Sequence, residues 1–289
     1  MENVIELHKV NKKFKKFEIK DFSLNVKKGF VTGFIGANGA GKSTTLKMIM
    51  NILQPDSGEI RIFGDSYQKS EKTIKDRIGI VYDDNVFYEQ LTLKEMRDII
   101  APSYSKWDES QFMKYIEQFE IPLKSKTKTF SKGMKMKASL AFALSHHAEL
   151  IIMDEPTAGL DPVFRRELLN ILNDLMQDGD KTIFFSSHIT TDLDRIADNI
   201  SFIHDGQHVF SKEFDAIEED YALVKGPLSS LNQNIEQKFL SIRKTSSGFE
   251  GLTNNVNHLI VEFSNDKVSV EKASLEDIIY YTKRGKKNA

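Results

Sequence analysis

A glycine-rich run between a strand-like and a helix-like segment is the part of the sequence best suited to chemistry. Val31–Ile35 has the pattern of a buried strand, and Thr44–Met50 that of a first helical turn. The run between them fits G-x-x-x-x-G-K-[ST], in which backbone N–H groups and a helix N-terminus surround phosphate oxygens. We predict a nucleotide-phosphate site, with Lys42 reaching the β- and γ-phosphates and Ser43 binding Mg²⁺. Its residues are Gly36, Asn38, Gly39, Ala40, Gly41, Lys42, Ser43 and Thr44.

Two adjacent carboxylates follow a second apolar run. Leu150–Met153 is continuously apolar, as in a parallel strand covered on both faces, and it is followed by Asp154 and Glu155. Carboxylates at the end of a buried strand are costly unless a cation or a reaction uses them. Asp154 therefore suits a Mg²⁺ ion, and Glu155 suits the water that attacks the γ-phosphate.

A third strand-like segment, Lys181–Ser187, is followed by His188. A histidine in this position can simply be a hydrogen-bonded polar residue of the core. However, three parallel strands would end at the same edge of a sheet, where open α/β folds bind their ligands. There, His188 can contact the γ-phosphate or orient the attacking water.

With these motifs in this order, the chain resembles the ATP-binding cassette ATPases, the motor subunits of ABC transporters. Phe130–Met134 is similar to the LSGGQ signature of that family, and Ala158–Asp161 matches its D-loop. The resemblance covers about residues 1–220. It implies an α/β P-loop NTPase fold: a RecA-like parallel sheet core, an N-terminal antiparallel β portion and an inserted helical subdomain at about 84–148.

In the family, the signature of one chain completes the nucleotide site of another. Ser131 and Gly133 lie at the start of an expected helix, Lys132–Leu144, where a hydroxyl, free N–H groups and the helix dipole form a second anion site. The resemblance implies that two chains, identical or paralogous, enclose two ATP molecules between them. Ser131, Gly133 and Asp161 would then contribute to nucleotide binding, while Ser131 also serves as a helix N-cap.

Three positions depart from the family pattern. Phe14 occupies the usual place of the tyrosine that stacks on the base, and Asp83 replaces the glutamine of the Q-loop, where it can still offer oxygen to Mg²⁺ or water. Met134 replaces the last glutamine of the signature. Phe14 also lies in a lysine-rich run, 12–17, which suggests either a solvated hairpin or contact with nucleic acid or anionic lipid.

The composition is that of a soluble enzyme. The chain has 289 residues, of which 28% are charged and 40% hydrophobic, with a net charge of −2 and no cysteine. The lack of cysteine excludes disulfides and thiol catalysis. The balanced charge gives no electrostatic reason to expect nucleic acid as a partner, and no apolar run reaches the roughly 20 residues of a membrane helix. Met1–Glu6 has no signal-peptide pattern, so we expect a cytoplasmic protein.

Residues 221–289 are expected to form a separate, small α+β domain. Asn257–Phe263 and Lys267–Val270 have strand patterns around a turn at 264–266, and Ser274 with Asp277 forms a capping box for a helix through Tyr281. A frayed basic tail, 283–287, would follow. The domain either packs on the rest of the assembly or regulates it.

The resemblance leads to a functional hypothesis: an ATP-hydrolysing motor subunit at the cytoplasmic face of the membrane, bound to a separate transmembrane permease. The finer similarity is to Gram-positive bacterial exporters of antimicrobial peptides, phenol-soluble modulins and antibiotics. The adjacent aromatics Phe87 and Tyr88 would anchor a helix of the membrane subunit, unless both pack inside the helical subdomain. The alternative function is a soluble ABC ATPase that acts on ribosomes or DNA.

Overall fold

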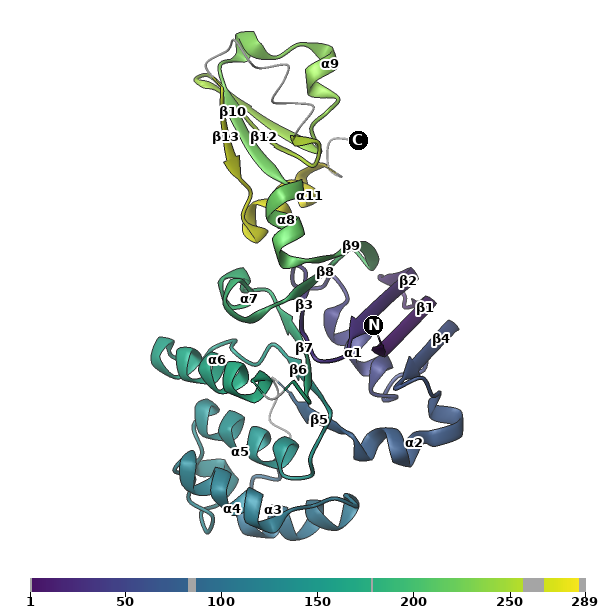
Figure 1. Ribbon diagram of the computed structural model, residues 1–289, viewed down its shortest axis with the longest axis vertical. Coiled ribbons are helices and arrows are strands. Elements are labelled where there is room, and N and C mark those ends of the chain that lie inside the picture. The colour runs from purple at the N-terminus through teal and green to yellow at the C-terminus, as the bar shows by residue number, and fades with distance from the viewer. Residues whose placement is uncertain (1, 83–86, 178, 257–267, 286–289) are drawn as a thin grey trace. The chain divides into compact units, whose positions relative to one another are not determined.

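The computed structural model describes residues 2–82, 87–177, 179–256 and 268–285 (Figure 1). The chain forms two compact units, Met1–Ser211 and Lys212–Ala289. This division lies before the expected boundary at residue 220. The reason is that helix α8 (Phe214–Asp220) is tied to the second unit, where Lys272 Nζ bonds Glu218 Oε2 at 2.6 Å.

The first unit is built on a six-stranded sheet with the strand order β5-β6-β7-β3-β8-β9. The pairs β5–β6, β6–β7, β7–β3 and β3–β8 are parallel, so their carboxyl ends share one edge. Strands predicted at 31–35, 150–153 and 181–187 are confirmed as β3, β6 and β7. The sheet strands are β3 (Val31–Ile35), β5 (Ile78–Val81), β6 (Leu150–Asp154), β7 (Thr182–Ser187), β8 (Asn199–His204) and β9 (Gln207–Glu213). The helices joined to them are α1 (Lys42–Ile49), α6 (Pro162–Met176) and α7 (Thr190–Ile196).

A second sheet of the first unit is antiparallel, with the order β2-β1-β4. Its strands are β1 (Asn3–Lys13), β2 (Glu18–Lys27) and β4 (Ser57–Ile62), and helix α2 (Tyr67–Asp76) follows. The lysine-rich run forms the β1–β2 hairpin turn, which is closed by a 2.7 Å bond from Phe14 N to Phe17 O. This confirms the hairpin expected from the sequence.

Helices dominate residues 87–148 (Figure 1). Three of them start at side-chain caps that the sequence contains: Thr92 for α3 (Leu93–Ile100), Asp108 for α4 (Glu109–Gln118) and Ser131 for α5 (Lys132–Leu144). Short 3₁₀ turns lie at Ala101–Ser103 and Thr127–Thr129. The predicted fold class, a parallel α/β core with an antiparallel portion and inserted helices, is therefore confirmed.

The second unit contains a four-stranded sheet, β11-β12-β10-β13, with a small apolar core. The core side chains are Val224, Ile235, Phe239 and Phe249. Its elements are β10 (Ala222–Gly226), a 3₁₀ turn (Leu228–Ser230), α9 (Gln233–Glu236), β11 (Ser241–Thr245), β12 (Gly248–Thr253), β13 (Ser269–Lys272) and α11 (Leu275–Gly285).

Two predictions for this unit were wrong in detail. The strand expected at 267–270 lies at Ser269–Lys272, in register with β10. The last helix continues beyond Tyr281 to Gly285 instead of fraying, because Tyr281 is buried and Arg284 bonds Tyr280, one turn earlier. The strand and turn predicted at 257–266 and the end of the basic tail lie outside the described residues.

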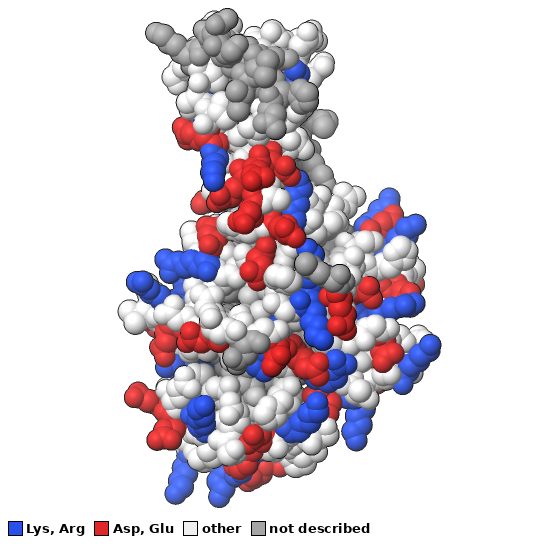
Figure 2. Space-filling model, viewed as in Figure 1, with Lys and Arg blue, Asp and Glu red and all other residues white. Residues whose placement is uncertain are grey.

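Figure 2 shows acidic and basic side chains interspersed over the visible face of the first unit. In the second unit, acidic side chains gather at α8, which carries Asp215, Glu218, Glu219 and Asp220. Among the described residues, none of the helices is both long and apolar enough to cross a bilayer.

Candidate functional site

The glycine-rich run forms a loop from the end of β3 to the start of α1. The backbone of Gly41 is left-handed, with φ of 114°, and Gly41 caps the helix without any side-chain hydrogen bond. A Cβ at Gly41 would lie 2.9 Å from the Phe17 ring, and one at Gly36 would lie 2.6 Å from the Ile203 carbonyl oxygen. Both positions therefore need glycine. The helix starts at Lys42, two residues before the predicted start, so its first N–H groups face the loop.

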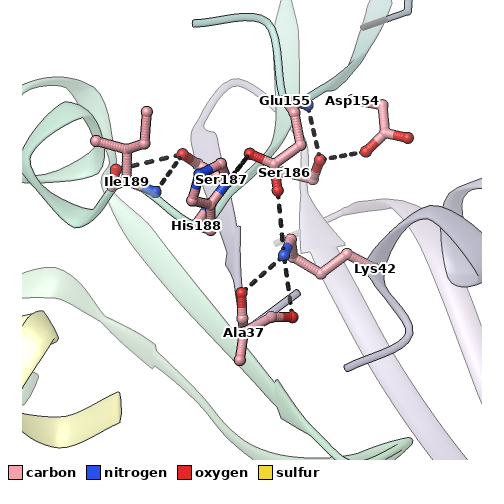
Figure 3. Close-up of polar contacts among 9 residues, drawn as sticks. Ala37, Lys42, Asp154, Glu155, Ser186, Ser187, His188 and Ile189 are labelled. Atoms are coloured by element: carbon pink, nitrogen blue, oxygen red, sulfur yellow. Dashed lines mark hydrogen bonds and ion pairs between the residues drawn. The ribbon is translucent and has the colours of Figure 1, made fainter. Parts of the chain in front are cut away.

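Lys42 is at the centre of the polar contacts (Figure 3). Its side chain is only 5% exposed, and its Nζ atom donates to Gly36 O at 2.7 Å and Ala37 O at 3.4 Å. The same ammonium lies 3.1 Å from Glu155 Oε1. The structure thus brings the lysine of the loop and the carboxylate after β6 into one ion pair, a direct contact that the sequence analysis did not predict.

Ser186 of the neighbouring strand β7 bridges Asp154 and Glu155. The Ser186 hydroxyl donates to Asp154 Oδ1 at 2.6 Å, and Glu155 N donates to Ser186 Oγ at 3.0 Å. Glu155 has a φ of 48°, a left-handed conformation in which the chain turns sharply after the strand. Ser186 was not predicted from the sequence, and the one local signal for it was the polar Ser186–Ser187 end of β7, next to the predicted His188.

His188 contacts the second oxygen of Glu155. Its Nδ1 atom lies 2.6 Å from Glu155 Oε2, and its backbone N–H donates to the same oxygen at 3.1 Å. The turn is fixed by Ser187 Oγ, which accepts from Ile189 N at 2.9 Å (Figure 3). Glu155 is therefore oriented by a cation on one side and an imidazole on the other, an arrangement suited to a general base.

A cavity of about 660 Å³ opens beside these groups. Lys42, Ser43, Glu155 and His188 line it, together with Lys16, Phe17, Asn38, Gly39, Gly41, Thr44 and Ala158. The lining fits a nucleoside triphosphate: a left-handed glycine loop, the N-terminus of a helix and an ammonium converge on it. Gly39 leaves open space, since a Cβ there would meet nothing within 4 Å.

The residues also fit Mg²⁺, but only together with phosphate. Among the residues that the structure describes, no group of three or more His, Cys, Asp or Glu could hold a metal. Mg²⁺ is commonly bound by one or two protein ligands plus substrate phosphates, and the exposed Ser43 hydroxyl and the half-buried Asp154 would be such ligands. The ion would neutralise phosphate charge during hydrolysis. Asp83, the third expected ligand, lies outside the described residues.

The aromatic expected to stack on the base, Phe14, does not line this cavity. Phe14 is 42% exposed, and it is Phe17, together with Lys16, that lines the cavity. The two rings are stacked at 6.4 Å between centroids. Both aromatics lie in the turn between β1 and β2, and the role of Phe14 in stacking on the base stays a prediction.

Ser131, Gly133 and Asp161 are not part of this cavity lining. Ser131 is exposed and caps α5, with its Oγ accepting from Met134 N at 3.2 Å. Asp161 caps α6 by accepting from Phe164 N at 3.0 Å, and Gly133 packs against the Phe164 ring. The signature and the end of the D-loop are thus joined to each other rather than to the nucleotide loop of their own chain.

The fold and the site define a P-loop nucleotide-binding protein, and comparisons with known proteins identify the class more closely. A family model described as ABC transporter matches residues 19–158. The chain is 33% identical over 284 residues to the bacitracin transport ATP-binding protein BcrA of Bacillus licheniformis, covering 92% of this chain and 91% of the relative. It is 32% identical to the ABC transporter ATP-binding protein YtrB of Bacillus subtilis (strain 168), covering 77% and 76%.

Solved structures agree with this result. The ATP-binding subunit of an ABC transporter is 30% identical with a TM-score of 0.68, covering 75% of this chain and 92% of that one. A dimeric ATP-binding cassette bound to ADP and Pi shares the fold at 23% identity and a TM-score of 0.64, covering 72% and 98%. The chain therefore belongs to the ABC transporter family as an ATP-binding, ATP-hydrolysing subunit. The predicted family and ATPase activity are confirmed.

Proposed function

We propose that the chain is the motor subunit of an exporter of peptide antibiotics or related amphipathic compounds, located at the cytoplasmic face of the membrane. The main support is the similarity to a bacitracin transport protein, which extends over 92% of this chain and so includes residues beyond the nucleotide-binding unit. In this proposal, ATP hydrolysis by two copies, or by this chain and a paralogue, drives a separate membrane subunit.

The roles that we assign to the site residues are supported by their contacts. Lys42 and the loop N–H groups bind phosphate oxygens, while Ser43 and Asp154 hold Mg²⁺. Glu155 accepts a proton from the attacking water, and His188 keeps Glu155 oriented through the 2.6 Å contact. Ser131 and Gly133, which are absent from the cavity lining, act on the nucleotide of the second chain.

A second cavity, of about 700 Å³, suits the membrane subunit. Apolar residues line it, among them Met50, Ile52, Ile78 and Tyr104, and its rim carries Glu71 and Lys75. Tyr82, the residue before the expected docking loop, also lines it, and Ile52 is 59% exposed. We propose a short amphipathic helix of the membrane subunit as the occupant, because the apolar floor and the mixed-charge rim match such a helix.

The first experiment asks which partner the full-length chain binds. A tagged chain is recovered from detergent-solubilised membranes of a Gram-positive host, and co-purified proteins are identified. We expect a hydrophobic multi-spanning protein that raises ATP turnover, and cells that become resistant to a bacitracin-like peptide only with intact Glu155. Recovery with ribosomes or DNA instead, without a membrane protein, would support the soluble alternative and overturn the proposal.

The second experiment tests the docking cavity. Ile52→Asp places a charge on its exposed lining, and Ile99→Asp places one on a residue that is 55% exposed and does not line the cavity. Ile52→Asp is expected to lose the membrane subunit while keeping ATP binding, and Ile99→Asp to keep both. Equal retention of the membrane subunit by the two variants would exclude this cavity.

A further inference from the structure

Asp192 is a buried carboxylate outside the nucleotide site. It lies in the first turn of α7, and its side chain is 2% exposed. Its Oδ1 atom accepts from Arg165 Nε of α6 at 2.6 Å, and Arg165 Nη2 also donates to Thr191 Oγ1 at 2.9 Å. The other carboxylate oxygen, Oδ2, is buried without a hydrogen-bond partner. The pair joins α6 and α7, which pack against each other (Figure 1).

This arrangement makes the carboxylate dependent on one guanidinium. A buried charge is costly unless it is paired, and removing one partner of a buried ion pair leaves the other uncompensated. Helix α7 has no side-chain N-cap, so its first turn is held mainly by packing and by this pair.

The pair connects two loops that end at the nucleotide cavity. Asp192 lies in α7 shortly after the turn that contains His188, whose imidazole contacts Glu155. Arg165 lies one turn after Asp161, and its backbone N–H donates to Asp161 O at 2.9 Å. A displacement of α7 relative to α6 would therefore move the histidine turn away from the loop that contains the cavity residue Ala158.

We propose that Arg165 is a positioning residue for ATP hydrolysis, acting through Asp192 and the α7 turn on His188. It keeps the imidazole at hydrogen-bonding distance from Glu155 and holds the D-loop in a fixed relation to it. The proposal rests on the proposed roles of Glu155 and His188. The Arg165 side chain itself neither lines the cavity nor contacts Asp154 or Glu155.

The test compares Arg165→Met with Arg166→Met in the full-length chain. Arg166 is the exposed neighbour on the same helix. Arg165→Met is expected to lower kcat by about 10- to 100-fold with little change in the KM for ATP, because misplacement of a catalytic group by about 1 Å has effects of this size. Arg166→Met is expected to match the wild type, and equal kcat in Arg165→Met and Arg166→Met would overturn the proposal.

The double variant Arg165→Met/Asp192→Leu, which removes both charges of the pair, distinguishes a positioning role from a purely structural one. Replacing a buried ion pair by apolar side chains often preserves stability. A positioning role predicts that this variant unfolds near the wild-type temperature but keeps the low kcat. Recovery of wild-type kcat would show that the pair only stabilises packing, which would overturn the proposal.

His188→Ala provides the last comparison. If Arg165 acts through His188, then adding Arg165→Met to His188→Ala should reduce kcat little further. Full additivity of the two losses would contradict the inference while leaving the role of His188 intact. If His188→Ala itself hydrolysed ATP at the wild-type rate, the proposed role of His188 would be rejected instead.

Discussion

Lys42 and Glu155 form an ion pair in which both side chains are nearly inaccessible, 5% and 12% exposed, with 3.1 Å between Nζ and Oε1. The lysine belongs to the phosphate loop, and the glutamate is the proposed base. Phosphate oxygens are alternative anionic partners for the same ammonium. Nucleotide binding and the release of Glu155 toward water are therefore expected to be linked.

Glu155→Gln should uncouple the two events. The amide removes the negative charge beside Lys42, so ATP binding to the full-length chain is expected to be kept or to become tighter. Hydrolysis should slow by about 10²–10⁴-fold, the usual contribution of a positioned general base. Calorimetric titration and phosphate release measure the two quantities, with Glu167→Gln, on the exposed face of α6, as the control. Turnover near the wild-type value would contradict the role of Glu155.

Ser131→Arg and Lys42→Ala should fail in different ways. Ser131 lies outside the cavity of its own chain, so Ser131→Arg should stop turnover but leave ATP affinity nearly intact. Lys42→Ala should weaken ATP binding itself. Because Ser131→Arg also removes a helix cap, at a cost of about 1 kcal/mol, Thr92→Arg at the cap of α3 is the matched control. If Ser131→Arg and Lys42→Ala lowered affinity equally, each chain would build a complete site alone.

The parts of the fold that could be predicted are those that depend on local pattern. Buried parallel strands are continuously apolar, so β3, β6 and β7 were found within one residue. Helices α3 and α5 begin directly after Thr92 and Ser131, because the hydroxyls of these residues accept hydrogen bonds from the first free backbone N–H groups of each helix. The shared edge of the sheet then brought Lys42, Glu155 and His188 together, as expected.

The parts that could not be predicted depend on contacts between distant segments. Ser186 bridges Asp154 and Glu155 only because β6 and β7 pair with Asp154 opposite Ser186. Phe17, and not Phe14, lines the cavity, although both lie in the turn between β1 and β2. The length of α11 depends on the burial of Tyr281 and its 2.5 Å bond to Glu250, which is 31 positions away. The contacts of Phe17 and Tyr281 leave no local signal, and that of Ser186 leaves only the polar end of β7.

Phe87 and Tyr88 should no longer be treated as one anchor. Phe87 is 6% exposed and lies 6.1 Å from the Phe142 ring, so it packs inside the helical portion, whereas Tyr88 is 68% exposed. Phe87→Ala is expected to lower the free energy of unfolding by about 3–5 kcal/mol. Tyr88→Ala should leave stability unchanged but weaken recovery of the membrane subunit. Urea unfolding and co-purification measure these effects, and unchanged recovery with Tyr88→Ala would remove this loop from the interface.

His146 is expected to make stability depend on pH. Its ring is buried and stacked on Tyr104 at 3.8 Å, with Nδ1 and Nε2 each 3.1 Å from a carbonyl oxygen, of Phe142 and Ile78 respectively. Burial lowers the pKa of His146 below its ordinary value of 6.5, although the two carbonyls and the charge of Asp76 act in the opposite direction. The unfolded chain therefore binds a proton near pH 6.5, whereas the folded chain does so only at lower pH.

The free energy of unfolding should accordingly fall as the pH drops from 7.5 to 5.5, since the unfolded state binds more protons in this range. His146→Phe keeps a ring on Tyr104 but removes the titration, so its stability should fall less. Some dependence of its stability on pH should remain, because burial also lowers the pKa of His208.

His147→Asn is the control: His147 is exposed and has a left-handed φ of 57°, which asparagine tolerates. Urea midpoints at pH 7.5, 6.5 and 5.5 decide the matter, and an equal decline in His146→Phe and the wild type would show that His146 titrates alike in both states.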